Sequence, residues 1–283
     1  MSIIHYIKNK KKLDFTKLRS KLEAKFLAVK IESRGVGNYY IWIDGKSTKG
    51  VDVTIYDDRV EIRNTTLSND NDYKLTNFLG VTISVLTRGK IYSENDKQLR
   101  IPILFSKKEI VKIQLSDCDI MISLCGDNEI SIYGPIRKIH FGKRLHQKLN
   151  SLRNKPEFLI STVLNLILKV QYGLPEYTYG TTMEMVKENT DTPYLLKLIT
   201  NTQDTIIDKY EYIMFNKPNC DDEVIMIKND TLNKILPVEW ELIDEYMIIA
   251  PILKEQSWNE LVEKANQLNE YDVFGLELKE RKR

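Results

Sequence analysis

A run of short alternating strands followed by a long amphipathic helix is the feature that most constrains the fold of this chain. Residues 51–55 and 60–63 alternate apolar and polar side chains around a turn at 56–59, as in a hairpin with one buried face. From 68 to 86, apolar side chains recur at the spacing of one helical face: Leu75, Phe78, Leu79, Thr82, Ile83 and Leu86. Gly89 ends this helix, and a strand follows at 90–93. This order predicts an α+β fold, with helices packed on one face of antiparallel sheets.

The rest of the chain supplies further elements of both kinds. We expect helices at 14–25, 141–150, 157–170, 230–236 and 257–268, the first capped by Asp14 and the last by a Ser257–Glu260 capping box. We expect strands at 26–31, 39–44, 109–115, 120–124, 129–133, 179–186, 210–215, 223–227 and 246–249. Residues 125–128 are expected to form a turn between two of these strands.

Charge divides the 283-residue chain into two halves, although the net charge is only +2. Residues 1–150 hold 27 Lys and Arg against 17 Asp and Glu, and residues 151–283 hold 15 against 23. Residues 152–156 contain a proline and no periodicity, as a linker would. We therefore predict a basic α+β domain at 1–150 and an acidic α+β domain at 151–283. The opposite charges of the halves have two interpretations. In the first, the halves dock on each other or their composition has drifted; in the second, one half faces a charged partner.

The cysteines and the apolar segments indicate a cytoplasmic protein. Cys118, Cys125 and Cys220 are too few and too scattered for a disulfide framework, so we expect free thiols. The apolar start of the chain is too short for a signal peptide and is followed by lysines, the reverse of the usual order. The most apolar segment, 158–170, is shorter than the roughly 20 residues of a membrane span and contains Lys169. We expect a buried helix there and no contact with a membrane.

No strong catalytic, metal or cofactor motif is present in the sequence. His5, His140 and His146 match no zinc spacing. Residues 34–37 contain two glycines, as at the start of a phosphate-binding loop, but the third glycine of that motif and the helix that should follow it are missing. Glu277 and Lys279 follow Asp272 too closely for the hairpin of a nuclease active site. The lysines at 8–12 resemble a solvated terminal run, so we do not expect nucleic acid as a partner. We therefore predict no catalytic residue, no metal and no cofactor.

One cluster of the acidic half mixes carboxylates with aromatic side chains. It consists of Glu239, Trp240, Glu241, Asp244, Glu245 and Tyr246. Acidic side chains at the rim of an interface speed association with a basic partner, and a buried aromatic anchor slows its release. The alternative is that Trp240 belongs to the core and that the acids are only solvated. We take these residues as the predicted partner-binding site. A second acidic cluster lies at 221–223.

The N-terminal third resembles an uncharacterised bacterial protein family of unknown function. The similar parts are the opening at 7–13, the hairpin from Ser47 through Arg63, and the helix at 68–79. This resemblance carries no catalytic residues. It implies a bacterial cytoplasmic protein of an accessory or defence-related kind.

Together these observations favour a non-enzymatic protein that binds another protein. An immunity protein whose partner is a basic toxin would fit the size, the missing motifs and the acidic half. The alternative is an enzyme or a nucleotide-binding protein whose site is assembled from dispersed residues, since catalytic groups need only be close in space. A deep cleft with clustered carboxylates or histidines would favour the enzyme, and a flat acidic-aromatic surface would favour the binder.

Overall fold

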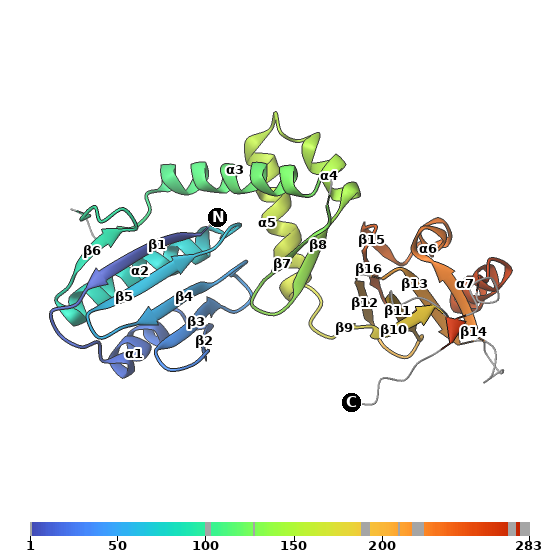
Figure 1. Cartoon of the computed structure of the whole chain (residues 1–283), viewed down its shortest axis with the longest axis horizontal. Coiled ribbons are helices and arrows are strands. Elements are labelled where there is room, and N and C mark those ends of the chain that lie inside the picture. The colour runs from blue at the N-terminus through green and yellow to red at the C-terminus, as the bar shows by residue number, and fades with distance from the viewer. Residues whose placement is uncertain are drawn as a thin grey trace. The chain divides into compact units, whose positions relative to one another are not determined.

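The computed structural model describes residues 2–99, 103–126, 128–187, 193–208, 210–216, 224–270 and 276–277, which form an α+β fold, as predicted (Figure 1). The chain divides into two compact units. The first unit comprises Met1–Leu124, Ile132–Ile139 and Leu149–Leu174, and the second comprises Cys125–Ser131, His140–Lys148 and Pro175–Arg283. This division differs from the predicted boundary between residues 150 and 151, because residues 149–174 group with the first unit and two short segments before 150 group with the second.

The first unit is built on a six-stranded antiparallel sheet in the order β2-β3-β4-β5-β1-β6. Its strands are β1 (Ile3–Lys8), β2 (Val29–Ser33), β3 (Asn38–Ile43), β4 (Val51–Ile55), β5 (Arg59–Asn64) and β6 (Lys90–Ser93). The predicted hairpin and the strand at 90–93 are confirmed. The N-terminal strand β1 was not predicted, and it lies between β5 and β6.

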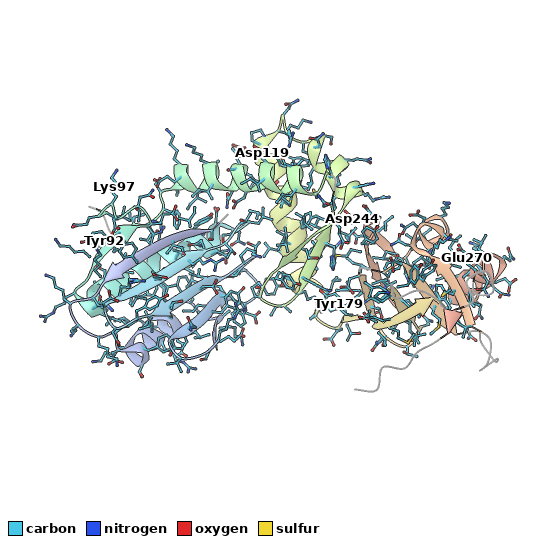
Figure 2. The ribbon with its side chains drawn as sticks, viewed as in Figure 1. Tyr92, Lys97, Asp119, Tyr179, Asp244 and Glu270 are labelled. Atoms are coloured by element: carbon cyan, nitrogen blue, oxygen red, sulfur yellow. The ribbon has the colours of Figure 1, made fainter. Side chains whose placement is uncertain are left out.

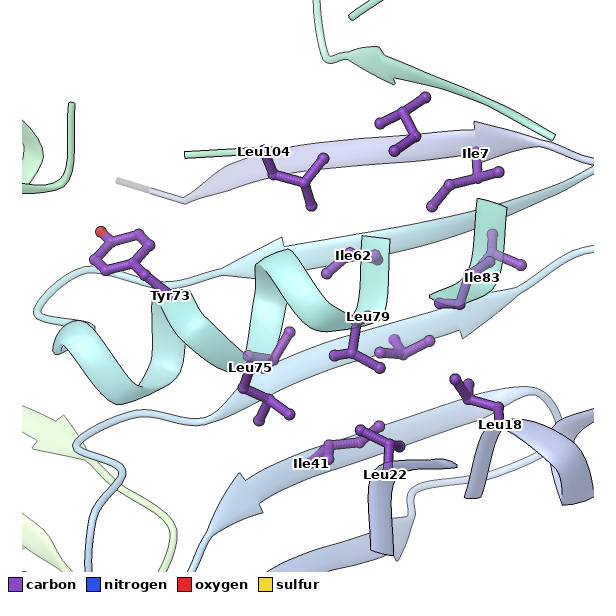
Figure 3. Close-up of a cluster of buried hydrophobic side chains, with 14 of the residues drawn as sticks. Ile7, Leu18, Leu22, Ile41, Ile62, Tyr73, Leu75, Leu79, Ile83 and Leu104 are labelled. Carbon is purple, nitrogen blue, oxygen red and sulfur yellow. The ribbon is translucent and has the colours of Figure 1, made fainter. Parts of the chain in front are cut away.

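Helices α1 (Phe15–Lys25) and α2 (Asp70–Thr87) bury their apolar sides in the core over one face of this sheet. Figure 3 shows α2 side chains meeting the strands, with Leu18 and Leu22 of α1 alongside. The two predicted helices are confirmed, and Asp14 caps α1 by accepting from the Lys17 N–H. Asn69 caps the start of α2, and Arg88, which follows its last residue Thr87, adopts the left-handed conformation.

Helix α3 (Lys107–Leu124) occupies the segment for which two strands were predicted, at 109–115 and 120–124. The strand prediction was wrong because it weighted the β-branched residues above their spacing. The buried side chains recur at helical offsets: Gln114, Asp117, Cys118, Met121 and Ile122. The turn predicted at 125–128 therefore follows a helix, not a strand. Cys118 and Cys125 are buried, and Cys220 lies outside the described residues.

A hairpin of β7 (Ile130–Tyr133) and β8 (Lys138–Phe141) contributes to both units and precedes α4 (Lys143–Asn150) and α5 (Pro156–Tyr172). The helix predicted at 141–150 begins later than expected, because Phe141 belongs to β8. The predicted linker at 152–156 is a turn that leads into α5, whose first residue is its proline.

The second unit holds two sheets, in the orders β14-β13-β11-β10-β17 and β15-β16-β12-β9. Their bounds are β9 (Thr178–Tyr179), β10 (Thr181–Lys187), β11 (Pro193–Ile199), β12 (Thr205–Asp208), β13 (Tyr212–Asn216), β14 (Val224–Lys228), β15 (Glu241–Asp244), β16 (Met247–Ala250) and β17 (Leu276–Glu277). Most pairs are antiparallel, but β11 pairs with β13, and β9 with β12, in parallel. Strands β11, β12, β15 and β17 were not predicted.

Helices α6 (Asn229–Ile235) and α7 (Glu255–Gln267) contribute buried side chains to the core of the second unit, together with strands of both sheets. Both helices were predicted, but the expected capping box of α7 is wrong. The helix begins two residues before Ser257, and Lys254 precedes it without a side-chain cap. The Ser257 hydroxyl donates instead to Glu239 Oε1, at 3.2 Å.

Candidate functional site

The predicted partner-binding residues surround the β15–β16 hairpin, but they do not share one exposed face. Glu239 and Glu241 are exposed, Glu245 and Tyr246 are half-buried, and Asp244 is fully buried. The alternation of inward and outward side chains along a strand separates them. The acidic cluster predicted at 221–223 lies outside the described residues.

Trp240 is a core residue, not an exposed anchor. Its side chain is 7% exposed and packs in the apolar cluster that holds Phe215 and Ile248. Its indole Nε1–H donates to the Pro251 carbonyl at 3.1 Å, which satisfies the one polar atom of the ring. The alternative interpretation of Trp240, as part of the core, therefore describes the structure.

Asp244, labelled in Figure 2, and Glu245 are bound to the start of α4. Asp244 Oδ2 accepts from the backbone N–H groups of Gly142 and Leu145, at 2.9 and 3.0 Å. Glu245 accepts from those of Lys143 and Arg144, at 2.5 and 2.9 Å. The first N–H groups of a helix have no partner within the helix, and carboxylates stabilise this end of the helix dipole. These two acids therefore cap a helix that lies about a hundred residues earlier in the chain.

The environments of the two capping carboxyl groups differ. Burial raises the pKa of Asp244, and the neighbouring Glu245 adds to this shift. Burial alone would also raise the pKa of Glu245, but hydrogen bonds from Asp244 and from the backbone lower it. Glu245 is therefore the member of the pair that carries the negative charge.

His140 is the centre of a buried polar network in the second unit. Its Nε2 lies 3.3 Å from Asp208 Oδ2, and its Nδ1 lies 2.7 Å from Glu129 Oε1 and 2.9 Å from Ser131 Oγ. Lys197 Nζ donates to Asp208 Oδ1 at 2.6 Å. Acid and base alternate along this chain of groups, which is how buried charges are stabilised in proteins.

Glu129 also lines a polar cleft of about 720 Å³, whose walls all belong to the second unit. Its charged walls are formed by Glu129, Asp230, Glu245, Lys143 and Arg144. The other polar lining comes from Asn128, Gln147, Asn233 and Tyr246. The cleft thus contains two of the predicted site residues, Glu245 and Tyr246.

Negative charge dominates around the Tyr246 hydroxyl. Burial raises the pKa of this phenol, and four carboxylates raise it further, namely those of Glu129, Glu245, Asp230 and Glu211. A phenol loses its proton less readily where the surrounding potential is negative. The side chains of Lys143 and Arg144 are exposed, so water screens their charge more than that of the half-buried Glu129 and Glu245. The inner part of the cleft is therefore suited to a cation.

Asn233 adds an unused hydrogen-bond acceptor to the cleft. Its Nδ2 donates to Asn229 Oδ1 at 2.8 Å, whereas its buried Oδ1 accepts no hydrogen bond from any described residue. A buried acceptor without a partner is costly, and a ligand that donates would satisfy it.

Sequence reasoning missed Glu129, Asp230 and Asn233, because Glu129 lies far from the other two in the sequence and none of the three belongs to a motif. Of the other candidates, His5 is buried in the first unit, where it packs edge-on against Phe105, and residues 34–37 form a turn before β3. Residues 272 and 279 lie outside the described residues. Over the described ranges, no group of three or more His, Cys, Asp and Glu side chains could hold a metal ion.

Comparison of the chain with protein-family models, with curated proteins and with solved structures finds no match. None of the helices in the described part of the chain is long and apolar enough to cross a membrane.

Proposed function

We propose that this chain is a non-enzymatic, protein-binding protein of the bacterial cytoplasm, and that its polar cleft receives a basic side chain of the partner. The observation that carries the proposal is the group of carboxylates near the Tyr246 side chain, three of which, on Glu129, Asp230 and Glu245, line the cleft together with it. A partner of the immunity type, a basic toxin, would present such Lys or Arg side chains.

Three features of the cleft favour a guanidinium or ammonium group. The carboxylates supply opposite charge, the free Oδ1 of Asn233 supplies an acceptor, and the Tyr246 ring offers an aromatic surface for a cation. The first N–H groups of α4, which would otherwise attract an anion, are already bound to Asp244 and Glu245. These N–H groups are therefore not available to bind a phosphate or a carboxylate.

The groups that could act as a catalytic acid or base are held in internal contacts. Asp208 lies between His140 and Lys197, and Glu245 is bound to the backbone of α4. A general base must reach a proton of the substrate, and these side chains are directed at other protein groups. This arrangement supports a binding role for the cleft.

N-acetylargininamide should bind the cleft at least about tenfold more tightly than N-acetylcitrullinamide, its uncharged counterpart of the same shape. Asp230→Asn should weaken the arginine compound about tenfold, because it removes one carboxylate without changing side-chain volume. Titration followed by NMR at two salt concentrations measures both effects.

The matched control is Glu239→Gln, which removes an exposed carboxylate outside the cleft and should leave the affinity for both compounds unchanged. Equal binding of the two compounds would refute the proposal.

A second candidate function is an acyl-transfer hydrolase with Ser131 as nucleophile. The observation that favours it is the chain of contacts from Ser131 through His140 to Asp208. Against it, the Nδ1 that would take the serine proton lies closer to the Glu129 carboxylate than to the hydroxyl.

We predict that a fluorophosphonate probe will not label Ser131 in the folded protein. The Glu129 carboxylate competes for the histidine nitrogen, so the hydroxyl is not activated. Mass spectrometry of the labelled protein, with Ser131→Ala as the reference, makes the measurement. Stoichiometric labelling that Ser131→Ala abolishes would establish the hydrolase instead.

A further inference from the structure

The six-stranded sheet of the first unit has a second face, opposite the one that packs on α1 and α2. Side chains alternate along a strand, and the burial pattern assigns Ile7, Val60 and Ile91 to the core. Their neighbours Lys8, Arg59 and Lys90 therefore lie on the opposite face. The register places Lys8 directly opposite both Arg59 and Lys90, so the three bases form one row across β5, β1 and β6.

Two tyrosines form the adjacent row. Tyr6 pairs with Tyr92, and their rings stack with centroids 5.5 Å apart. The Lys8 ammonium lies 4.7 Å from the centroid of the Tyr92 ring. Figure 2 labels Tyr92. We call Tyr6, Lys8, Arg59, Lys90 and Tyr92 the tyrosine–lysine patch. Like charges directly opposite each other destabilise a sheet. At one end of the row this is offset within the chain, because Arg59 Nε donates to Glu61 Oε1 at 2.9 Å and Arg59 Nη1 lies 3.8 Å from Asp58 Oδ2.

At Lys8 and Tyr6, the patch holds a further carboxylate of the chain itself. Asp96 accepts a hydrogen bond from the Tyr6 hydroxyl and lies 3.5 Å from Lys8 Nζ. It reaches the patch from the loop after β6, with the left-handed backbone angle φ 57°. This hydrogen bond lowers the pKa of Asp96 and raises that of Tyr6 to about 12. Carboxylate is therefore the ligand chemistry that fits the patch.

We propose that the tyrosine–lysine patch binds an acidic segment of a partner protein, whose carboxylates take the place of Asp96 and extend over Arg59 and Lys90. This surface belongs to the first unit and carries the opposite charge from the polar cleft, so it is independent of the function proposed above. Tyrosine and arginine are also the residues that contribute most to the binding energy of protein interfaces.

The same observations disfavour a single-stranded nucleic acid on this face. Nucleobases stack on aromatic rings whose faces are open. Here the two tyrosine rings stack on each other, and Lys8 covers the Tyr92 ring.

The test selects peptides from a random phage-displayed library on the wild-type protein. We expect the selected peptides to be enriched in Asp and Glu. The affinity of these peptides should fall at least about tenfold when Lys8→Glu and Lys90→Glu are combined. Lys90→Glu alone should lower the affinity by a smaller factor. Lys21→Glu with Lys25→Glu makes the same change in net charge on exposed positions of α1 and should leave affinity unchanged. Circular dichroism confirms that each variant is folded.

Asp96→Asn gives the most specific outcome. It removes the internal carboxylate from Lys8 and Tyr6, so the selected peptides should bind several-fold more tightly. A general attraction between opposite net charges would be only slightly changed by this substitution. The proposal is overturned by equal losses in the two double variants, by peptides without acidic enrichment, or by no gain for Asp96→Asn. It is also overturned if oligo-dT binds and Lys8→Glu with Lys90→Glu abolishes that binding.

Discussion

Replacing Asp72 by Ala is expected to lower the free energy of unfolding of the first unit by about 3–5 kcal/mol, the cost of removing one member of a buried charged network. Asp72 is fully buried at the start of α2. Its carboxylate accepts from the backbone N–H groups of Thr48, Lys49, Gly50 and Asn69, and from the Thr48 hydroxyl. Without it, these donors are left buried with no acceptor, at about 1–3 kcal/mol each where water cannot enter.

The control for this prediction is Lys74→Ala, an exposed position on the same helix. It should change stability by no more than about 0.5 kcal/mol. Chemical denaturation followed by circular dichroism gives both values. Burial raises the pKa of Asp72, while hydrogen bonds to the surrounding donors oppose that shift. If Asp72→Ala unfolded at the same denaturant concentration as Lys74→Ala, Asp72 would not be what attaches the 47–50 loop to α2.

Replacing Asp244 by Ala should destabilise the second unit by about 2–4 kcal/mol, because a cap and several buried hydrogen bonds are lost together. Gly142 and Leu145 lose their acceptor, and the Glu245 N–H loses its bond to Asp244 Oδ1. The start of α4 then loosens, and with it one wall of the polar cleft. Glu239→Ala, a nearby exposed carboxylate, should have almost no effect.

The pH dependence of Asp244→Asn follows from the raised pKa of Asp244. A carboxyl group whose pKa is raised by folding stabilises the protein fully at pH values below its pKa in the unfolded chain, about 4. This stabilisation is lost as the pH rises through the pKa of the group in the folded protein. An amide cannot lose a proton, so the stability gap by which wild type exceeds Asp244→Asn should narrow from about pH 4 to about pH 7, where the folded pKa of Asp244 lies. Thermal unfolding across this range measures the gap. A gap that widens with pH would show that Asp244, rather than Glu245, carries the charge.

The sequence predicts the elements whose patterns are local. The hairpin around 56–59 and helix α2 follow from alternation and helical spacing within short windows. Strand β1 was missed because it pairs with β5 and β6, which are distant in the sequence. For α3, the β-branched composition suggests strands, and only the spacing of its buried residues reveals a helix.

The candidate site was harder to predict, because the sequence shows that a carboxylate exists but not what it faces. Glu245 and Tyr246 were found from a local cluster, and they do line the cleft. Asp244 looks the same in the sequence as an exposed rim acid, yet it is fully buried against α4. Asp230 and Glu129 join the site only through the tertiary fold.

The most direct test of the proposed cation site is the position of a bound arginine side chain. Nuclear Overhauser contacts between N-acetylargininamide and the labelled protein would locate it. We predict contacts from the arginine side chain to the Tyr246 ring and to the Asn233 amide, and their loss in Asp230→Lys. Contacts that lie outside the polar cleft, or that persist unchanged in Asp230→Lys, would contradict the account.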